Sequence, residues 1–257
     1  MKYNMKKIAF VTGASSGFGE AIAKSLAKLD YNLILTARNE AKLQKVIQEI
    51  LSVSDVEVLP LIFDIQDYSA CEKAIQSIPE AFKDIDVLVN NAGLAVELEK
   101  IHTGAIEDWE RMINTNVKGL LYMSRLITPR MVERKKGHII NMGSISSREV
   151  YIGGNVYCAT KHAVLALSQG MRMDLLPFGI KVTHVSPGAA ETEFSITRFH
   201  GDTEKAKKVY EGYEPLVAAD IANVVEYVVS LPEHVCINEI NLTCTAQFNG
   251  VIVKNNQ

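Results

Sequence analysis

Three side chains that can take part in proton transfer lie close together in residues 142–163, whose sequence is MGSISSREVYIGGNVYCATKHA. Tyr157 and Lys161 are four residues apart, so in a helix they face the same side. Tyrosine has a pKa of about 10, and a neighbouring ammonium lowers it, which favours a phenolate that accepts a proton from an alcohol. Ser144 can donate a hydrogen bond to an oxygen on which negative charge develops. The segment therefore predicts acid–base catalysis, unless it is only a strand end, a Gly-rich turn and an ordinary helix.

The elements that must position these residues are short apolar runs that alternate with helix-periodic stretches along the whole chain. Continuous Val/Ile/Leu runs between helices are typical of a parallel sheet that is covered on both faces. We therefore predict a single doubly wound α/β domain over residues 1–257, with helices on both faces of about seven parallel strands. The expected strands are residues 7–13, 31–37, 56–65, 84–93, 137–144, 179–188 and 237–243.

Three segments add detail to this plan. Pro60 indicates that the third strand pairs late or on one side only, because proline cannot donate to a ladder. A long helix is expected from about residue 108 to 133. Residues 189–215 are polar, with a weak helical pattern in their first half, and a stretch of this length is often a functional lid. We predict that residues 189–215 form a substrate loop within the domain.

Composition and charge exclude several classes of protein. The chain of 257 residues is 47% hydrophobic and has a net charge of −3, and its basic residues form no long run, so we expect no nucleic-acid partner. No segment approaches the roughly 18 apolar residues that a membrane span needs, and the early run IAFV is too short for a signal peptide. The four cysteines share no close spacing, which predicts neither a metal site nor a redox pair. We expect a cytoplasmic protein that has no membrane partner.

Three glycines follow the first expected strand and open an amphipathic helix in VTGASSGFGEAIAKSLAKL. Glycines at this place let the backbone approach a pyrophosphate, whose charge the amides of the helix N-terminus meet. The spacing of Gly13, Gly17 and Gly19 is G-x-x-x-G-x-G rather than the generic fingerprint, and a tight turn without a ligand is the alternative. A P-loop is excluded because no Gly-Lys-Ser/Thr follows.

The end of the second strand, LTARNE, indicates which nucleotide is bound. Ala37 stands where an NAD-binding fold places an acid, and Arg38 can bind a 2′-phosphate through two hydrogen bonds, so the sequence favours NADP. Asp64 ends the third strand, where it can accept from an adenine amino group or cap the next helix. NNAG, residues 90–93, ends the fourth strand and can shape a turn beneath an adenosine or be a simple turn.

Together these motifs resemble the classical short-chain dehydrogenase/reductase family. TGASSGFG, NNAG, NTNVKG, the serine of MGSIS, YCATK and SPG occur in that family's order across essentially the whole chain, with Ser144 thirteen residues before Tyr157. The resemblance implies a single Rossmann-type domain, usually assembled as a tetramer, with a nicotinamide cofactor across the strand ends. It implies pairing between subunits through the long helix and the helix after Tyr157.

The resemblance also assigns roles to residues. It implies that Tyr157 is the general base or acid, that Ser144 binds the substrate oxygen and that Lys161 holds the nicotinamide ribose. Asn116 would support a water relay to Lys161, and an asparagine inside a helix is intrinsically unfavourable. Thr192 matches the threonine that the family commonly places near the carboxamide. The residues implied in cofactor binding are Gly13, Ser15, Ser16, Gly17, Phe18, Gly19, Arg38, Asp64, Ile65, Asn91, Ala92, Gly93, Tyr157, Lys161, Pro187, Gly188 and Thr192.

A narrower resemblance lies in GGNVYCATKHA and TEFSITRFHGD, which are similar to the NADP-dependent 3-hydroxy acid dehydrogenases. That group oxidises serine, allo-threonine and related short 3-hydroxy acids such as 3-hydroxypropionate, and reduces malonic semialdehyde. Two alternatives stay open. One is a reductase of a larger carbonyl, such as a 3-oxoacyl thioester or a ketone. The other is a module that senses NADP(H) without turnover, although such modules often lose a catalytic residue and none is missing here.

A small hydroxy acid needs a cation for its carboxylate, because a buried unpaired carboxylate is costly. Arg148 lies between Ser144 and Tyr157, and we expect it to bind the carboxylate, with Glu149 holding the arginine or contacting a substrate ammonium. A mutual surface pair of Arg148 and Glu149 is the alternative. Arg198, in the 189–215 segment, is the other candidate for the carboxylate. Aromatic residues that can cover the site are Tyr151, Phe194 and Phe199.

Overall fold

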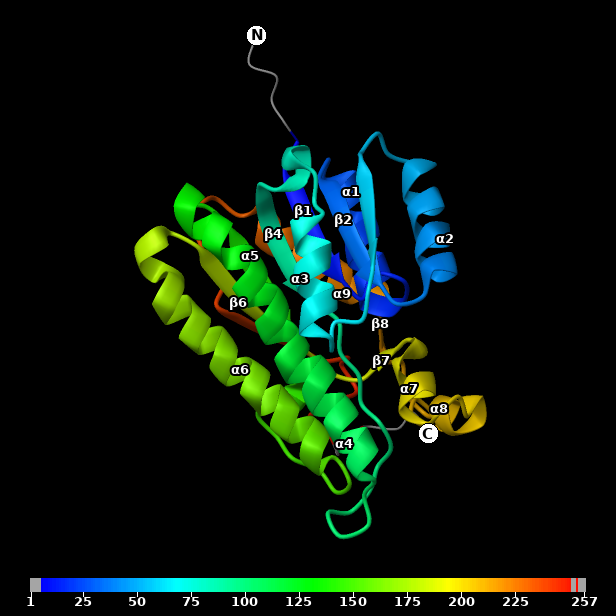
Figure 1. Cartoon of the computed structure of the whole chain (residues 1–257). Coiled ribbons are helices and arrows are strands. Elements are labelled where there is room, and N and C mark those ends of the chain that lie inside the picture. The colour runs from blue at the N-terminus through cyan, green and yellow to red at the C-terminus, as the bar shows by residue number, and fades with distance from the viewer. Residues whose placement is uncertain (1–5, 251–252, 254–257) are drawn as a thin grey trace.

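The computed structural model describes residues 6–250 and 253, and its centre is one sheet of seven parallel strands in the order β3-β2-β1-β4-β5-β6-β9 (Figure 1). Each of the seven expected strands is confirmed. Their bounds are β1 Ile8–Thr12, β2 Asn32–Ala37, β3 Val58–Ile62, β4 Ile85–Asn90, β5 His138–Met142, β6 Lys181–Pro187 and β9 Glu239–Leu242. The strand order reverses direction between β1 and β4, and ligands of doubly wound folds bind at the carboxyl ends of the strands beside such a point.

Helices cover both faces of this sheet, as predicted (Figure 1). Successive strand residues point to opposite faces, so Ala9 and Val11 join one apolar cluster while Ile8 and Phe10 join the other. The first cluster lies under α1 Gly17–Lys28, α2 Glu40–Leu51 and α9 Ala218–Ser230. The second lies under α3 Tyr68–Gln76, α5 Leu120–Arg134 and α6 Asn155–Leu175. Short 3₁₀ turns span η1 Glu80–Phe82, η3 Ile145–Ser147 and η4 Leu176–Phe178.

The edge strand β3 explains the proline in its sequence. Pro60 is in register with Leu35 of β2, and β3 has no partner strand on its other side within the described residues. The missing N–H of Pro60 therefore interrupts no ladder on that open side, and the prediction of one-sided pairing is confirmed.

The long helix expected over residues 108–133 begins earlier and is not α-helical throughout. It consists of α4, Ile106–Ile113, a π-helical stretch, Asn114–Gly119, and then α5. Single π turns inside α-helices are rare and occur frequently at functional sites. Asn116 lies within this one.

Residues 189–215, which we call the lid segment, contain more regular structure than predicted. Two helices, α7 Glu193–Arg198 and α8 Thr203–Lys208, follow β7 Ala190–Glu191, which pairs with β8 Leu216–Val217. The Thr192 hydroxyl accepts from Phe194 N at 3.2 Å and starts α7, and Asp202 caps α8 in the same way. Helices of six residues have fewer than two turns, so no apolar periodicity marks them in the sequence. α7 and α8 lie at the end of the molecule opposite the start of β1 (Figure 1).

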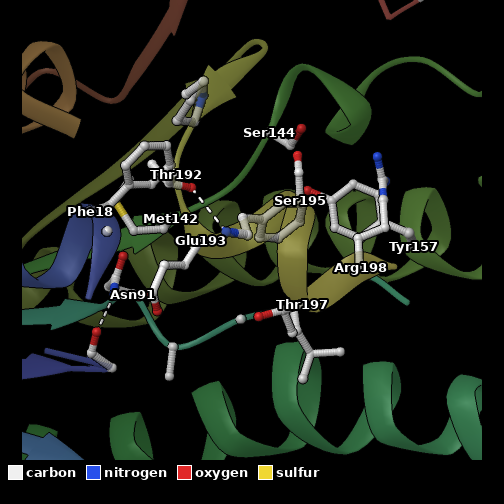
Figure 2. Close-up of a pocket in the computed structure, with 18 of the residues that line it drawn as sticks. Phe18, Asn91, Met142, Ser144, Tyr157, Thr192, Glu193, Ser195, Thr197 and Arg198 are labelled. Atoms are coloured by element: carbon white, nitrogen blue, oxygen red, sulfur yellow. Dashed lines mark hydrogen bonds between the residues drawn. The ribbon is translucent and has the colours of Figure 1, made fainter. Parts of the chain in front are cut away.

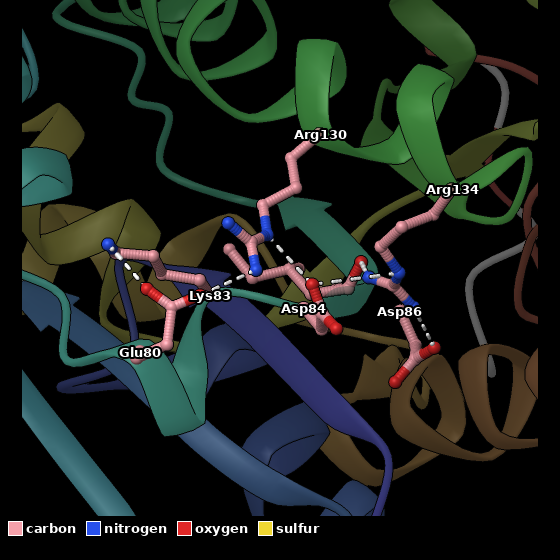
Figure 3. Close-up of polar contacts among 7 residues, drawn as sticks. Glu80, Lys83, Asp84, Asp86, Arg130 and Arg134 are labelled. Carbon is pink, nitrogen blue, oxygen red and sulfur yellow. Dashed lines mark hydrogen bonds and ion pairs between the residues drawn. The ribbon is translucent and has the colours of Figure 1, made fainter.

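Ion pairs join the amino end of β4 to the last turn of α5 (Figure 3). Asp86, whose side chain is 11% exposed, accepts from Ile8 N at 3.0 Å and pairs with Arg134 at 2.8 Å and Lys136 at 3.1 Å. The neighbouring Glu80 is 73% exposed and pairs with Arg130 and Lys83. The largely buried carboxylate of Asp86 therefore joins β1, β4 and α5, whereas the exposed carboxylate of Glu80 makes only surface ion pairs.

Replacing Asp86 with alanine is expected to lower the free energy of unfolding by about 1–3 kcal/mol, because the Ile8 amide loses its side-chain acceptor and Arg134 and Lys136 each lose an ion pair. Glu80→Ala, the matched control, should cost less than about 1 kcal/mol, since exposed ion pairs contribute little. Urea denaturation measures both values. Equal losses in the two variants would contradict this account of Asp86.

Among residues 6–250 and 253, no helix is both long and apolar enough to cross a bilayer. The same residues contain no group of three histidine, cysteine or acidic side chains placed to hold a metal ion.

Candidate active site

A cavity of about 540 Å³ opens at the carboxyl ends of the strands, between the sheet and the lid segment (Figure 2). It brings together most of the residues that the sequence predicted to be functional. Ser144, Tyr157 and Lys161 line it, together with all the predicted cofactor residues except Gly19. Those lining residues are Gly13, Ser15, Ser16, Gly17, Phe18, Arg38, Asp64, Ile65, Asn91, Ala92, Gly93, Pro187, Gly188 and Thr192. Asn116 and Arg148 are not among the residues that line the cavity.

The Gly-rich loop between β1 and α1 forms one wall of the cavity. Gly13 and Gly17 have φ angles of +65° and +57°, which residues with a Cβ rarely adopt. Gly19 lies behind the wall, where a Cβ would collide with the carbonyl of Gly13. Ser16 caps α1 without a side-chain hydrogen bond, so the first amides of this helix are not satisfied by the cap side chain. A pyrophosphate fits this cradle, because a helix N-terminus supplies N–H donors and positive potential.

Arg38 and Asp64 lie at the nucleotide end of the cavity. Arg38 is 57% exposed, and its Nη1 is 3.6 Å from the Asp64 carboxylate, a loose ion pair. Asp64 does not cap α3, because Asp67 accepts from Ala70 N at 3.1 Å and caps that helix. Asp64 instead accepts from Gln66 N at 2.9 Å and keeps its other oxygen toward Arg38. An exposed arginine beside the end of β2, with no acid at Ala37, fits a 2′-phosphate.

The NNAG turn forms the floor of the cavity and is fastened to the end of β1. Thr12 Oγ1 accepts from both Asn91 N and Ala92 N at 2.9 Å, and the Asn91 side chain donates to Thr12 O at 2.8 Å (Figure 2). A Cβ on Gly93 would lie 3.3 Å from Asn116 Oδ1 and 3.5 Å from Lys161 Nζ. The turn therefore passes close to the lysine of the catalytic segment.

Asn116 acts on the site indirectly. Its side-chain amide donates to Leu94 O and accepts from Leu94 N, both at 2.8 Å, and donates to Thr160 Oγ1 at 3.0 Å. Thr160 precedes Lys161 on α6, so Asn116 links the loop after the NNAG turn to the helix that carries the lysine. The π-helical stretch places this asparagine at the junction, where it is buried. The implied water relay stays a prediction.

Ser144, Tyr157 and Lys161 line the cavity together, and all three are buried. Ser144 Oγ accepts from Ser146 N at 3.1 Å and also hydrogen-bonds with the Tyr157 side chain. Lys161 Nζ donates to Met142 O at 2.9 Å and lies 5.9 Å from the centroid of the Tyr157 ring. Burial lowers the pKa of Lys161 to about 8.

Burial is also the largest influence on Tyr157, and it raises the pKa of its hydroxyl. Tyr151 raises the pKa further, while the charge of Arg198 and the hydrogen bond with Ser144 lower it. The sequence led us to expect that Lys161 lowers this pKa. Arg198, whose guanidinium carbon is 5.4 Å from the Tyr157 ring centroid, is the cation that does so in the structure.

The two arginines considered for a substrate carboxylate lie in different places. Arg148 is 52% exposed and forms two hydrogen bonds to Glu239 on the edge strand β9, at 2.8 and 2.5 Å, away from the cavity. Glu149 accepts from Gly250 N at 3.0 Å, so the expected pairing of Arg148 with Glu149 is not present. Arg198 lines the cavity and donates to the Tyr151 hydroxyl at 2.6 Å.

Aromatic residues surround this end of the cavity. Tyr151, Phe194 and Phe199 all line it, as their position in the sequence indicated, and Phe194 packs edge-on against Tyr157 with centroids 5.9 Å apart. Gln247 also lines it and accepts from Ala189 N at 2.8 Å. No pattern in the sequence marks Gln247, because it belongs to no motif and lies far from the other site residues along the chain.

Comparisons with known proteins agree with this geometry. A family model described as short chain dehydrogenase matches residues 7–202. The NADP-dependent 3-hydroxy acid dehydrogenase YdfG of Salmonella typhi is 45% identical to this chain, over 96% of the chain and 98% of its own length. The NADP-dependent 3-hydroxy acid dehydrogenase of Schizosaccharomyces pombe is 43% identical, over 90% of each chain. A solved structure, the closed form of serine dehydrogenase complexed with NADP⁺, has a TM-score of 0.90 at 41% identity and covers 97% of this chain and 100% of that one.

Proposed function

The chain belongs to the short-chain dehydrogenase/reductase family, and from that premise we propose that it is an NADP-dependent oxidoreductase acting on short 3-hydroxy acids. It transfers a hydride between the nicotinamide and the carbon that bears the hydroxyl group. Serine, allo-threonine and 3-hydroxypropionate are the proposed substrates, and malonic semialdehyde is the substrate in the reductive direction. The observation that carries the proposal is the convergence of Ser144, Tyr157 and Lys161 on one cavity with the phosphate cradle and Arg38.

The proposed reaction divides its work among these side chains. The Tyr157 phenolate accepts the hydroxyl proton of the substrate, and in reduction the phenol returns it. Ser144 donates a hydrogen bond to the substrate oxygen and stabilises the charge that develops there. Lys161 holds the ribose hydroxyls and adds positive charge close to the tyrosine. Bound NADP⁺ supplies the hydride acceptor and a positive ring, and burial of the site excludes water.

The size of the site favours a short substrate over a larger carbonyl. Tyr151, Phe194 and Phe199 crowd the cavity around Tyr157, and Phe194 contacts the catalytic ring directly. The longer chain of a 3-oxoacyl thioester would have to lie against these rings when its carbonyl is at Tyr157, whereas a short hydroxy acid would not. A module that senses NADP(H) without turnover would not need a proton donor and an oxyanion donor in the same cavity, yet Ser144, Tyr157 and Lys161 all line it.

The substrate test measures formation of reduced cofactor from its absorbance at 340 nm, with NADP⁺ or NAD⁺ and a panel of alcohols as substrates. The panel contains serine, allo-threonine, 3-hydroxypropionate, 3-hydroxyisobutyrate and neutral secondary alcohols. The proposal predicts NADP⁺-dependent turnover of the 3-hydroxy acids. Turnover of the neutral alcohols alone would leave the family assignment intact but contradict the assignment of 3-hydroxy acids as substrates.

Arg38 is expected to set the cofactor preference. Arg38→Gln should lower the ratio of kcat/KM with NADP⁺ to kcat/KM with NAD⁺ by about 10- to 100-fold, because a charge-assisted hydrogen bond to the 2′-phosphate is lost. The change should lie in the KM for NADP⁺. Lys45→Gln is the control, since Lys45 is an exposed cation on the neighbouring α2 and does not line the cavity. An unchanged ratio in Arg38→Gln would assign the preference to another residue.

We also propose a homotetramer in which α5 and α6 pair between subunits. Both helices carry exposed apolar side chains, among them Leu121 on α5 and Met173 on α6. Light scattering of the purified chain should give about four times 28.4 kDa. A mass of 28.4 kDa at micromolar concentration would contradict the tetramer.

A further inference from the structure

Arg198 has an unusual position for a charged side chain. It ends α7 of the lid segment and points into the cavity beside Tyr157 (Figure 2). Its guanidinium carbon lies 5.4 Å from the ring centroid of Tyr157, 5.7 Å from that of Phe194 and 5.9 Å from that of Tyr151. The cation is thus surrounded by aromatic rings at the place where a substrate must meet the catalytic tyrosine.

The hydrogen bonds of this guanidinium are incomplete. Nη2 donates to the Tyr151 hydroxyl at 2.6 Å, but Nε is buried and has no hydrogen-bond partner among the described residues. Within residues 6–250 and 253, no carboxylate forms an ion pair with Arg198. A buried N–H of a charged group without an acceptor is costly, so the geometry calls for an acceptor that the described chain does not supply.

Resting on the proposed function, we propose that Arg198 binds the carboxylate of the 3-hydroxy acid, with Nε and a terminal N–H donating to its two oxygens. A guanidinium presents these donors as a fork that matches a carboxylate. In a 3-hydroxy acid the hydroxyl carbon lies close to the carboxylate. The same small molecule can therefore place its hydroxyl group at Tyr157 and its carboxylate at Arg198.

The other cations in or near the cavity are less suited to binding the substrate carboxylate. Arg38 lies at the nucleotide end, beside Asp64, and Lys161 donates to Met142 O behind the tyrosine. Arg148 already has a carboxylate partner in Glu239. Ring stacking alone would account for the position of the Arg198 guanidinium carbon but not for the unpaired Nε.

Carboxylate recognition by Arg198 also involves the lid. The carbonyl of Arg198 accepts from Glu97 N at 2.8 Å, and Lys205 of α8 pairs with the Glu97 carboxylate at 2.7 Å. The arginine is thus held between the lid segment and the loop after β4. A bound carboxylate would add a contact between the substrate and α7. An acidic substrate therefore favours the position of the lid segment in which Arg198 reaches the carboxylate.

The test compares 3-hydroxypropionate with its uncharged amide, using wild type, Arg198→Met, Arg198→Lys and the control Arg148→Met. Two quantities are measured: kcat/KM with NADP⁺, and the Kd of each compound for the NADPH-loaded enzyme by calorimetry. Arg198→Met should lower the acid-to-amide preference by about 100-fold in both quantities, because a hydrogen-bonded charge pair is lost. Arg198→Lys should restore part of it, since lysine keeps the charge without the fork. Arg148→Met should leave the preference unchanged.

The two readouts separate this inference from the proposed function. Binding of 3-hydroxypropionate that needs Arg198 but leads to no turnover would support the inference and remove the proposed function. Turnover of the acid with the same acid-to-amide preference in Arg198→Met and wild type would overturn the inference and leave the function. Absence of acid binding to the NADPH-loaded wild type would overturn the inference as well. A Kd for NADPH in Arg198→Met equal to that of the wild type would show that the variant is folded.

Discussion

Replacing Tyr157 with phenylalanine is expected to reduce kcat by about 10³-fold, because the variant has no hydroxyl to accept or return the substrate proton. Phenylalanine keeps the ring and therefore its edge-on contact with Phe194 and its packing against Arg198. NADPH affinity should change little, since the fold and the phosphate cradle are untouched. The measurement is steady-state oxidation of the best 3-hydroxy acid, together with NADPH binding by fluorescence.

A second tyrosine of the same cavity provides the matched control. The Tyr151 hydroxyl accepts from Arg198 rather than facing the reacting atoms, so Tyr151→Phe should raise the KM for the acid while kcat stays within about threefold of wild type. A kcat of more than a tenth of the wild-type value in Tyr157→Phe would mean that another group moves the proton.

Gly19→Ala is expected to damage both stability and cofactor binding. The added Cβ would collide with the carbonyl of Gly13, which is backbone and cannot turn aside as a flexible side chain can. Shifting Gly13 moves the wall of the phosphate cradle, so NADPH affinity should fall by at least about 10-fold, and the free energy of unfolding should fall by about 1–3 kcal/mol. Fluorescence titration and urea denaturation measure the two quantities.

Gly170 offers the control for this substitution. It lies inside α6, and a Cβ there meets nothing within 4 Å, so Gly170→Ala should raise stability by about 0.5–1 kcal/mol through helix propensity. NADPH affinity should not change. Wild-type affinity in Gly19→Ala would show that the loop accommodates a side chain and that the close approach of α1 to Gly13 is not required.

The fold was predictable because the central strands of its sheet are buried on both faces. The runs IAFV and VLV contain no polar residue, which distinguishes parallel strands from half-exposed ones, and they lie in β1 and β4. Pro60 even marked its strand as an edge strand. The helices of the lid segment escaped prediction, since six residues are too few for periodicity and their caps at Thr192 and Asp202 are ordinary polar residues of a loop.

Local motifs indicated which residues of the site come together, because each motif ends a strand and the ends of parallel strands meet at one edge. Gly13, Asn91 and Ser144 are examples, and all three line the cavity. The choice between Arg148 and Arg198 could not be made in this way. Arg148 is nearer to Tyr157 in the sequence, but the turn after η3 directs it to Glu239, whereas α7 brings Arg198 back over the site.

Asn116 is an intermediate case. The low helix propensity of asparagine indicated that Asn116 has a specific role. The structure places it in a π-helical stretch, with its side-chain amide hydrogen-bonded to Leu94 and Thr160. That geometry depends on contacts with residues 22 and 44 positions away, which no local pattern records.

The most direct measurement of the central claim uses 3-hydroxypropionate in which both hydrogens on the hydroxyl carbon are replaced by deuterium. After oxidation with NADP⁺, mass spectrometry of the NADPH reports where the deuterium has gone. The account predicts about one deuterium in every NADPH formed, and about a thousandth as much labelled NADPH when Tyr157→Phe is used at the same concentration for the same time. NADPH without deuterium, or no NADPH from any 3-hydroxy acid, would contradict hydride transfer from the hydroxyl carbon of these substrates.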